Sequence, residues 1–154
     1  MPKVLSVDPS RCTGCHRCEM WCSLTKYDEI NPSRSNIYVI RREPAVDVPM
    51  VCIQCGLCID VCPRNALKRV RKTGAVVVDA ELCTGCGICV KVCPYGVLRV
   101  DEETGVAAKC DLCGGSPACA AHCPHEAIRY MDASKAAAKR REIWAVALAA
   151  KNRA

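Results

Sequence analysis

Sixteen of the 154 residues are cysteines, and all of them fall into four short groups of four. The first three groups share the spacing C-x2-C-x2-C-x3-C, and the fourth is wider, C-x2-C-x5-C-x3-C. The groups are Cys12, Cys15, Cys18 and Cys22; Cys52, Cys55, Cys58 and Cys62; Cys83, Cys86, Cys89 and Cys93; and Cys110, Cys113, Cys119 and Cys123. No cysteine is left over, and so dense a pattern predicts a chain that folds around metal held by thiolates.

The spacing of the first three groups favours iron–sulfur clusters. It is the run that holds a 4Fe–4S cluster in bacterial ferredoxins, where the fourth cysteine, followed by proline, ligates the second cluster. Pro63, Pro94 and Pro124 follow the last cysteines of groups two to four, whereas Ser23 follows group one. Zinc sites instead pair C-x2-C units across a longer gap. Disulfides need an oxidising compartment, and no signal peptide precedes group one. We therefore expect four 4Fe–4S clusters and a cytoplasmic protein.

The rest of the composition agrees with a chain that depends on its cofactors. Phenylalanine is absent and aromatic residues make up 4% of the chain, so the apolar core must be thin. Metal binding and folding should then be coupled, and the apo chain should be largely unfolded. The formal charge of +6 would suggest nucleic acid. However, four clusters with their thiolates bring about −8, which leaves the loaded protein near −2. No stretch interleaves aromatic and basic side chains, so we expect no nucleic-acid partner.

Groups two and three are typical of a complete two-cluster ferredoxin, here the inner unit, residues 52–105. Between them lies a hairpin with a turn at 72–74 and a strand at 75–79. A short strand at 98–101 closes the unit, and residues 102–105 turn out of it. Crossing the fourth cysteines predicts one cluster on Cys52, Cys55, Cys58 and Cys93, and another on Cys62, Cys83, Cys86 and Cys89.

Groups one and four remain and are expected to pair with each other. A strand at 4–8 precedes group one and a strand at 127–130 follows group four. An antiparallel pair of these strands would close an outer unit, residues 1–22 and 106–131, around the inner one. The crossing rule then predicts one cluster on Cys12, Cys15, Cys18 and Cys123, and another on Cys22, Cys110, Cys113 and Cys119.

The insertion at residues 23–51 separates the two units. Its 29 residues between Cys22 and Cys52 disfavour the alternative in which neighbouring groups share clusters, because connections in proteins are usually short. The insertion carries a turn at 31–33 and a strand at 36–40. We expect it to add a strand, to cover a cluster or to contact a partner.

The last segment, residues 132–154, is expected to form a helix capped by Asp132 or Ser134. Its apolar stretch at 143–150 is far too short to span a bilayer, so we expect no membrane insertion. The helix, with Trp144, could pack on the protein's own clusters, dock on another subunit or join two copies of this chain. The fold class is therefore α+β, with two pseudo-symmetric bacterial-ferredoxin-like units, one nested inside the other, plus a C-terminal helix.

With its cysteines placed, the stretch 1–131 resembles the four-cluster ferredoxin-like subunits of molybdenum and tungsten oxidoreductases. These subunits serve dimethyl sulfoxide reductases, formate dehydrogenases and formate-linked hydrogenases. The compact fourth motif at 109–119, together with residues 22–25 and 31–33, is most similar to the small iron–sulfur subunit of tungsten-dependent aldehyde oxidoreductases. It is also similar to the subunits that work with carbon monoxide dehydrogenase or benzoyl-CoA reductase.

This resemblance implies a non-catalytic subunit that relays single electrons. They would pass between a molybdenum- or tungsten-bearing, aldehyde-oxidising subunit and a flavin/NAD subunit or a ferredoxin. The alternatives are a relay for carbon monoxide dehydrogenase, hydrogenase or benzoyl-CoA reductase, a free polyferredoxin, and an iron–sulfur sensor. No nucleophile–base pair and no phosphate-binding loop stands out.

Two kinds of polar residue lie near the cysteines. The three histidines are expected to hydrogen-bond or be solvated rather than to ligate, because each group already has four thiols; they are His16, His122 and His125. Nearby cations are expected to tune the cluster potentials; they include Arg17, Lys91 and Lys109.

Overall fold

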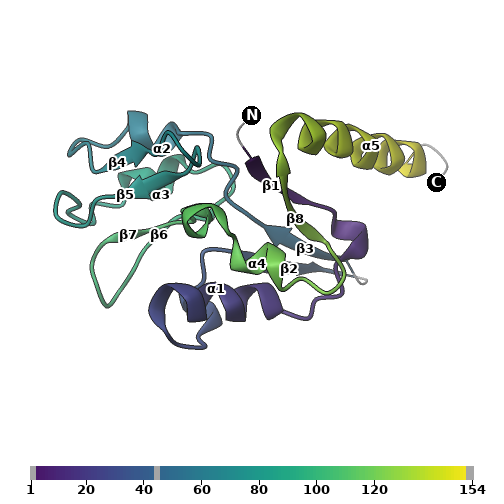
Figure 1. Cartoon of the computed structure of the whole chain (residues 1–154), viewed down its shortest axis with the longest axis horizontal. Helices are drawn as coiled ribbons and strands as arrows, with labels where there is room; N and C mark the ends of the chain where they lie inside the picture. The colour runs from purple at the N-terminus through teal and green to yellow at the C-terminus, as the bar shows by residue number, and fades with distance from the viewer. Residues whose placement is uncertain (1–2, 44–45, 152–154) are drawn as a thin grey trace.

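The computed structural model describes residues 3–43 and 46–151 (Figure 1). Short strands and helices alternate along the chain, which confirms the predicted α+β class. The elements are β1 (Lys3–Val7), η1 (Pro9–Arg11), α1 (Arg17–Tyr27), η2 (Pro32–Arg34), β2 (Tyr38–Arg42), β3 (Val46–Met50), α2 (Leu57–Asp60), β4 (Leu67–Arg69), β5 (Val76–Val78), α3 (Ile88–Val92), β6 (Arg99–Val100), β7 (Ala107–Ala108), η3 (Leu112–Gly115), α4 (Ala118–Ala121), β8 (Ile128–Asp132) and α5 (Ala133–Lys151).

The first and last strands of the molecule lie side by side. β1 pairs with β8 in antiparallel register, from Lys3 opposite Asp132 to Val7 opposite Ile128. This confirms the antiparallel pair predicted from the flanks of groups one and four. Leu5 and Ile128 are both buried, so the pair covers part of the core with one face.

The insertion forms a hairpin rather than the single strand predicted at 36–40. β2 pairs with β3, from Tyr38 opposite Met50 to Arg42 opposite Val46. β3 was not predicted because it contains Pro49, and a proline inside a strand is tolerated only at an edge. A two-stranded sheet consists of edges alone, so the proline fits. The predicted turn at 31–33 is present as η2, next to the hairpin.

Two further hairpins lie toward the left of Figure 1. β4 pairs with β5 as predicted, and Gly74 lies at φ 73° in the connecting turn. β6 pairs with β7, which was not predicted. Residues 102–105 therefore form the tip of a hairpin instead of leaving the unit, and Gly105 N donates to Asp101 O at 2.8 Å. A hairpin thus follows each of the first three cysteine groups.

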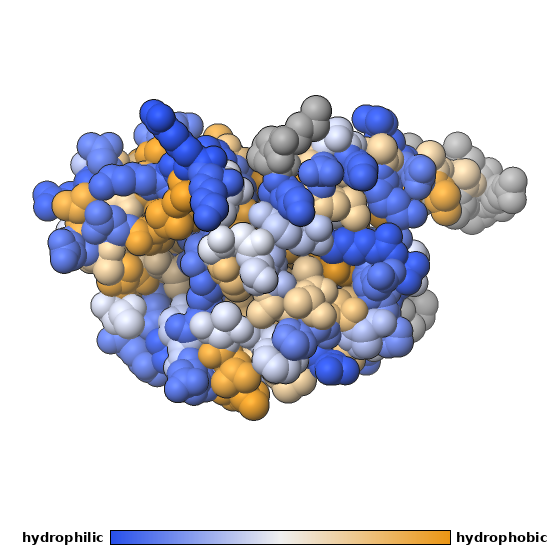
Figure 2. Space-filling view, in the orientation of Figure 1, coloured by the Kyte–Doolittle hydropathy of each residue, from blue (hydrophilic) through white to orange (hydrophobic). Residues whose placement is uncertain are grey.

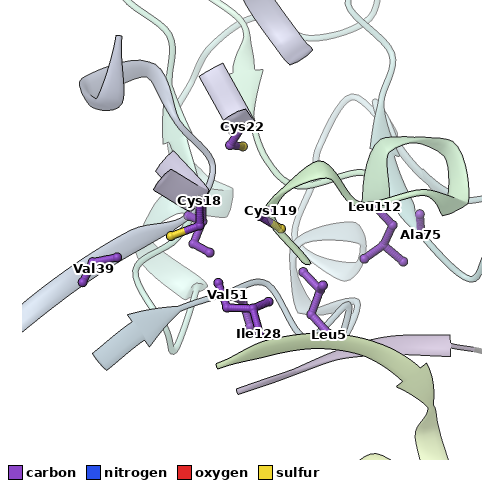
Figure 3. Close-up of a cluster of buried hydrophobic side chains, with 10 residues drawn as sticks. Leu5, Cys18, Cys22, Val39, Val51, Ala75, Leu112, Cys119 and Ile128 are labelled. Atoms are coloured by element: carbon purple, nitrogen blue, oxygen red, sulfur yellow. The ribbon is translucent and has the colours of Figure 1, made fainter. Parts of the chain in front are cut away.

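The core consists of two small clusters in which cysteines lie among aliphatic side chains. Figure 3 shows Cys18, Cys22 and Cys119 beside the aliphatic residues of the first cluster. The buried members of that cluster are Leu5, Cys18, Cys22, Ile37, Val39, Val51, Ala75, Leu112, Cys119 and Ile128. The second contains Cys58, Leu67, Val76, Cys89, Leu98 and Ala107. The sulfur sites are therefore part of the core itself, as the thin apolar composition suggests.

A buried ion-pair group ties the insertion to the β6–β7 hairpin. Asp101 is 2% exposed and accepts hydrogen bonds from Arg34 at 3.1 Å and Arg99 at 2.8 Å. The guanidinium of Arg34 also lies over the ring of Tyr27, 4.1 Å from its centroid. Burial alone would raise the pKa of Asp101, but the hydrogen bonds from Arg99 and Arg34 hold it well below its usual range.

The C-terminal helix is packed at its start and exposed toward its end. α5 lies along β1 and β8, and Ala136 is buried there. Further along, Trp144 is 62% exposed and Val146 is 71% exposed. Figure 2 shows hydrophobic side chains interspersed with hydrophilic ones along this helix. An apolar groove of about 440 Å³ runs between α5, β1 and β3, and its lining includes Leu5, Met50, Ile53, Ile143 and Trp144.

Within the part of the chain that the structure describes, no helix is long and apolar enough to cross a membrane. The predicted helical segment begins at Ala133, one residue after its expected start, and residues 152–154 lie outside the described ranges. Asp132 belongs to β8, and Ser134 lies inside the first turn of α5.

Candidate metal centres

Each of the first three cysteine groups lies on a loop that leads into a helix. Directly before α1, α2 and α3, one residue takes a left-handed conformation: His16 at φ 56°, Gly56 at φ 101° and Gly87 at φ 74°. In the fourth group, Cys113 and Gly114 are left-handed at φ 47° and φ 66°. These left-handed residues turn the loops sharply, so that the cysteines of one loop can face a common centre.

Three pockets in the structure are each lined by four cysteines that come from two different groups. The first pocket holds Cys12, Cys15, Cys18 and Cys123, here called set A. Another holds Cys52, Cys55, Cys58 and Cys93, called set C. The third holds Cys62, Cys83, Cys86 and Cys89, called set D. In each pocket, the last cysteine of one group joins the first three of another.

The remaining cysteines, Cys22, Cys110, Cys113 and Cys119, form the most enclosed set, called set B. Cys22 and Cys119 are buried, and none of the four is exposed. The pKa of the Cys119 thiol is raised mainly by burial, and further by the charges of the other three cysteines of the set. Set B therefore lies in the interior of the molecule.

The four sets follow one another in a single order. Buried cysteines of sets A and B pack together in the first core cluster, and those of sets C and D pack together in the second. Sets B and C are neighbours, because Gln54, which lines the pocket of set C, donates a hydrogen bond to the carbonyl oxygen of Cys110 in set B. The sets are therefore arranged as A, B, C, D.

Backbone N–H groups point at several of the sulfur atoms. Asn36 N, in the insertion, donates to Cys22 Sγ at 3.3 Å. The other three donors lie 3.4 Å from their sulfurs: Ala66 N to Cys62, Ala107 N to Cys83, and Leu112 N to Cys110. Donors of this kind stabilise negative charge on sulfur and raise the reduction potential of a cluster.

The donor set fits iron–sulfur clusters. Burial raises the pKa of Cys18 and of Cys110 to about 12, so these thiols would be protonated at neutral pH without metal and would lose their protons on metal binding. Among the described residues, no three His, Cys, Asp or Glu side chains converge closely enough to hold a single metal ion. The ligands of one zinc ion would all lie about 2.0–2.3 Å from it, whereas a cubane spreads its thiolates over four irons.

The insertion covers part of the pocket of set A, which is one of the three roles expected for it. Val39 and Pro49, from β2 and β3, line the pocket of set A. Val39 N donates to Glu19 Oε1 at 2.7 Å, and Glu19 Oε2 lies 2.6 Å from His16 Nδ1. The buried Glu19 thus fixes the insertion to the first cysteine loop.

A polar group between sets B and C contains a residue that the sequence did not single out. Gln54 Nε2 donates to Cys110 O at 2.9 Å, and Gln54 Oε1 accepts from Val76 N at 2.9 Å and from Lys109 Nζ at 3.1 Å. Gln54 also has a positive φ of 58°. Its position inside the second cysteine motif could have marked it as a candidate. Its hydrogen-bond partners could not be predicted, because they lie at least 22 residues away in sequence.

The three histidines lie near the cysteine sets. His16 interacts with Glu19, and the ring of His122 stacks on Trp21 with centroids 3.6 Å apart. His125 lines the pocket of set A, and its carbonyl oxygen accepts from Arg11 Nε at 2.8 Å.

Comparison with known sequences gives three overlapping matches to 4Fe-4S dicluster domain families. They cover residues 11–67, 51–97 and 75–124. Each match spans two neighbouring cysteine groups, and together they include all sixteen cysteines. The strands β1 and β8 and the helix α5 lie outside the matched residues.

Two curated relatives are similar over most of this chain. The polyferredoxin-like subunit of an aliphatic sulfonate oxidoreductase from Pyrococcus furiosus is 46% identical over 107 residues, which are 68% of this chain and 62% of the relative. Subunit beta of an NADH-dependent phenylglyoxylate dehydrogenase from Aromatoleum evansii is 37% identical over 112 residues, 70% of this chain and 25% of the relative. The chain thus spans less than two thirds of the length of either relative.

Among solved structures, the active-site complex BamBC of benzoyl coenzyme A reductase contains a similar chain. It is 25% identical, with a TM-score of 0.49, over 84% of this chain and 76% of that chain. The sequence matches and the four cysteine groups lead to one conclusion: residues 11–124 consist of 4Fe–4S dicluster domains, and the chain has the thiols for four 4Fe–4S clusters.

Proposed function

We propose that this chain is an electron-transfer subunit that relays single electrons along four clusters. The observation that carries this proposal is the order of the cysteine sets, A to D, with set B enclosed between A and C. Cys15 of set A and Cys86 of set D are exposed, so each end of the series reaches the surface. Cys55 of set C is exposed too, and could serve as a third point of contact.

In this proposal, the ligands are the four cysteines of each set, as the crossing rule predicts. Each cluster, when bound, takes up and releases one electron. Other parts of the chain position these thiolates. The paired strands β1 and β8 bring the first and fourth groups together, and backbone N–H groups donate hydrogen bonds to the sulfurs.

The proposed outer unit is residues 1–22 and 106–131, and the proposed inner unit is residues 52–105. The strand β7 falls in the outer range, but it completes a hairpin with β6 of the inner unit.

Cysteine variants test the ligand pairing. If groups two and three share clusters, Cys93→Ser alters the same electron paramagnetic resonance (EPR) signal as Cys52→Ser, because both belong to set C. If neighbouring groups three and four shared clusters instead, Cys93→Ser would alter the same signal as Cys119→Ser. The three variants, reduced and measured side by side, distinguish the two arrangements.

The proposed partner is the catalytic subunit of an oxidoreductase. The names of both curated relatives support this, since each is a subunit of such an enzyme. The finer proposal is a tungsten- or molybdenum-bearing, aldehyde-oxidising subunit at one end and a flavin/NAD subunit or ferredoxin at the other. The exposed Trp144 on α5 is a candidate contact for a partner subunit or a second copy.

Anaerobic purification of the undissociated protein from its native host tests the partner. We expect about sixteen irons per chain and a co-purifying subunit that contains tungsten or molybdenum. A lone chain with sixteen irons would instead indicate a free polyferredoxin, and zinc in place of iron would refute the relay.

A further inference from the structure

We propose that Lys109 sets the reduction potentials of the two middle clusters, those of sets B and C, through its fixed positive charge. This inference rests on the proposed relay and its ligand sets. The charge of this residue raises the potentials of the two middle clusters relative to those at the ends.

Lys109 lies between the two middle sets. Its side chain lines the pocket of set C, and its backbone is bonded directly to Cys110 of set B. Nζ donates three hydrogen bonds, to Val76 O and Cys110 O at 2.7 Å each and to Gln54 Oε1 at 3.1 Å. With three acceptors around it, the ammonium group is held in one position.

The surroundings of Lys109 indicate that it faces an anion. The residue is only 8% exposed, and all three of its acceptors are neutral. None of the ion pairs found among the described residues includes Lys109. A buried charge without a counter-charge is strongly unfavourable. Two thiolate-bound clusters, one on each side, would supply the missing negative charge.

A fixed buried cation favours the reduced form of a neighbouring cluster, because reduction adds negative charge. The other two cations singled out near the cysteines differ from Lys109 in their exposure to solvent. Arg17 and Lys91 are exposed, so water and salt screen their charges. Of the three cations singled out from the sequence, Lys109 is therefore the one expected to act strongly.

The test is a redox titration of the isolated, iron-loaded chain, followed by EPR spectroscopy. In Lys109→Met, we expect reduction of two clusters to become about tenfold less favourable, a shift of about 59 mV to more negative potential for a one-electron couple. The other two clusters should keep their potentials. Lys91→Met removes an exposed charge and should shift no cluster by a comparable amount. Lys109→Arg keeps the charge and should stay close to the wild type.

Equal potentials in Lys109→Met and the wild type would overturn the proposal, as would an equal shift of all four clusters. If Lys109→Met does not load iron, Lys109→Gln is titrated in its place. If both neutral variants fail to load while Lys109→Arg loads, the charge serves assembly rather than potential, and the proposal is wrong. Fewer than four reducible clusters in the wild type would refute the relay itself, which distinguishes the two failures.

Discussion

At the scale of single residues, Gly85 shows how closely the cysteine loops approach other backbone. A Cβ atom at this position would lie 2.2 Å from Gly105 O, and the residue already has a φ of +65°. Gly85→Ala should therefore displace the loop that carries Cys83 and Cys86. We expect the variant to lose about a quarter of its iron, one cluster of four, in an iron assay.

Gly87→Ala is the matched control for this prediction. Gly87 lies in the same loop at φ +74°, but an added Cβ would meet nothing within 4 Å. The control should keep its iron and lose only about 1–2 kcal/mol to the left-handed backbone. Equal iron loss in both variants would mean that backbone conformation, not contact with Gly105, is decisive.

Asp101 is a second residue whose replacement should lower the stability of the protein. Asp101→Asn would leave Arg34 and Arg99 without their buried counter-charge, at a cost of about 3 kcal/mol. The variant should lose its visible cluster absorbance at a lower urea concentration than the wild type. Lys68→Gln is the control, because the Lys68–Asp79 pair is exposed and should contribute about 1 kcal/mol or less.

The pH dependence of this contribution follows from the lowered pKa of Asp101. A carboxyl group whose pKa is lowered by folding stabilises the protein above its unfolded pKa, about 3.9. The stabilisation is lost as the pH falls toward the folded value. The difference between the wild type and Asp101→Asn should thus stay constant from about pH 8 to pH 5 and narrow only below about pH 4. A difference that already disappears near neutral pH would contradict this.

At the scale of elements, α5 is held by a small buried contact at its start. Ala136 is buried against the β1–β8 pair, whereas its neighbour Ala137 is exposed. Ala136→Leu should overpack the contact at a cost of about 1–3 kcal/mol and loosen the helix, because helices in proteins owe most of their stability to tertiary packing. Trypsin should then cleave faster after Arg140 and Arg141. Ala137→Leu should leave the cleavage rate near that of the wild type.

The elements also show what sequence reasoning can and cannot predict. The cysteine loops, the β1–β8 pair and the β4–β5 hairpin were predictable because their signals are local spacing, flanking strands and a turn. β7 was missed because two alanines carry no strand periodicity, and β3 because of Pro49. Gln54 and the pairs of Asp101 were missed for another reason. Their partners are up to 67 residues away in sequence, and only the folded chain brings them together.

At the scale of the whole molecule, stability and metal content should change together. Because the cysteines lie within both core clusters, removal of iron leaves buried thiols in place of the bonds that join one cysteine group to another. We expect a strong chelator under reducing conditions to abolish both the visible absorbance and most of the far-ultraviolet circular dichroism. A cooperative urea transition in the iron-free chain would contradict this expectation.

The pairing of β1 with β8 affects how the chain is made on the ribosome. β1 ends at Val7 and its partner begins at Ile128, so synthesis of the intervening segment separates them. At 5–20 residues per second, this interval lasts roughly 6–24 s. With the proposed ligand sets, the cysteines of sets C and D are all present well before this interval ends, whereas Cys12, Cys15 and Cys18 wait for Cys123. Newly made chains should therefore receive iron at the inner unit first, and their N-terminal thiols are the ones that oxygen can reach in the meantime.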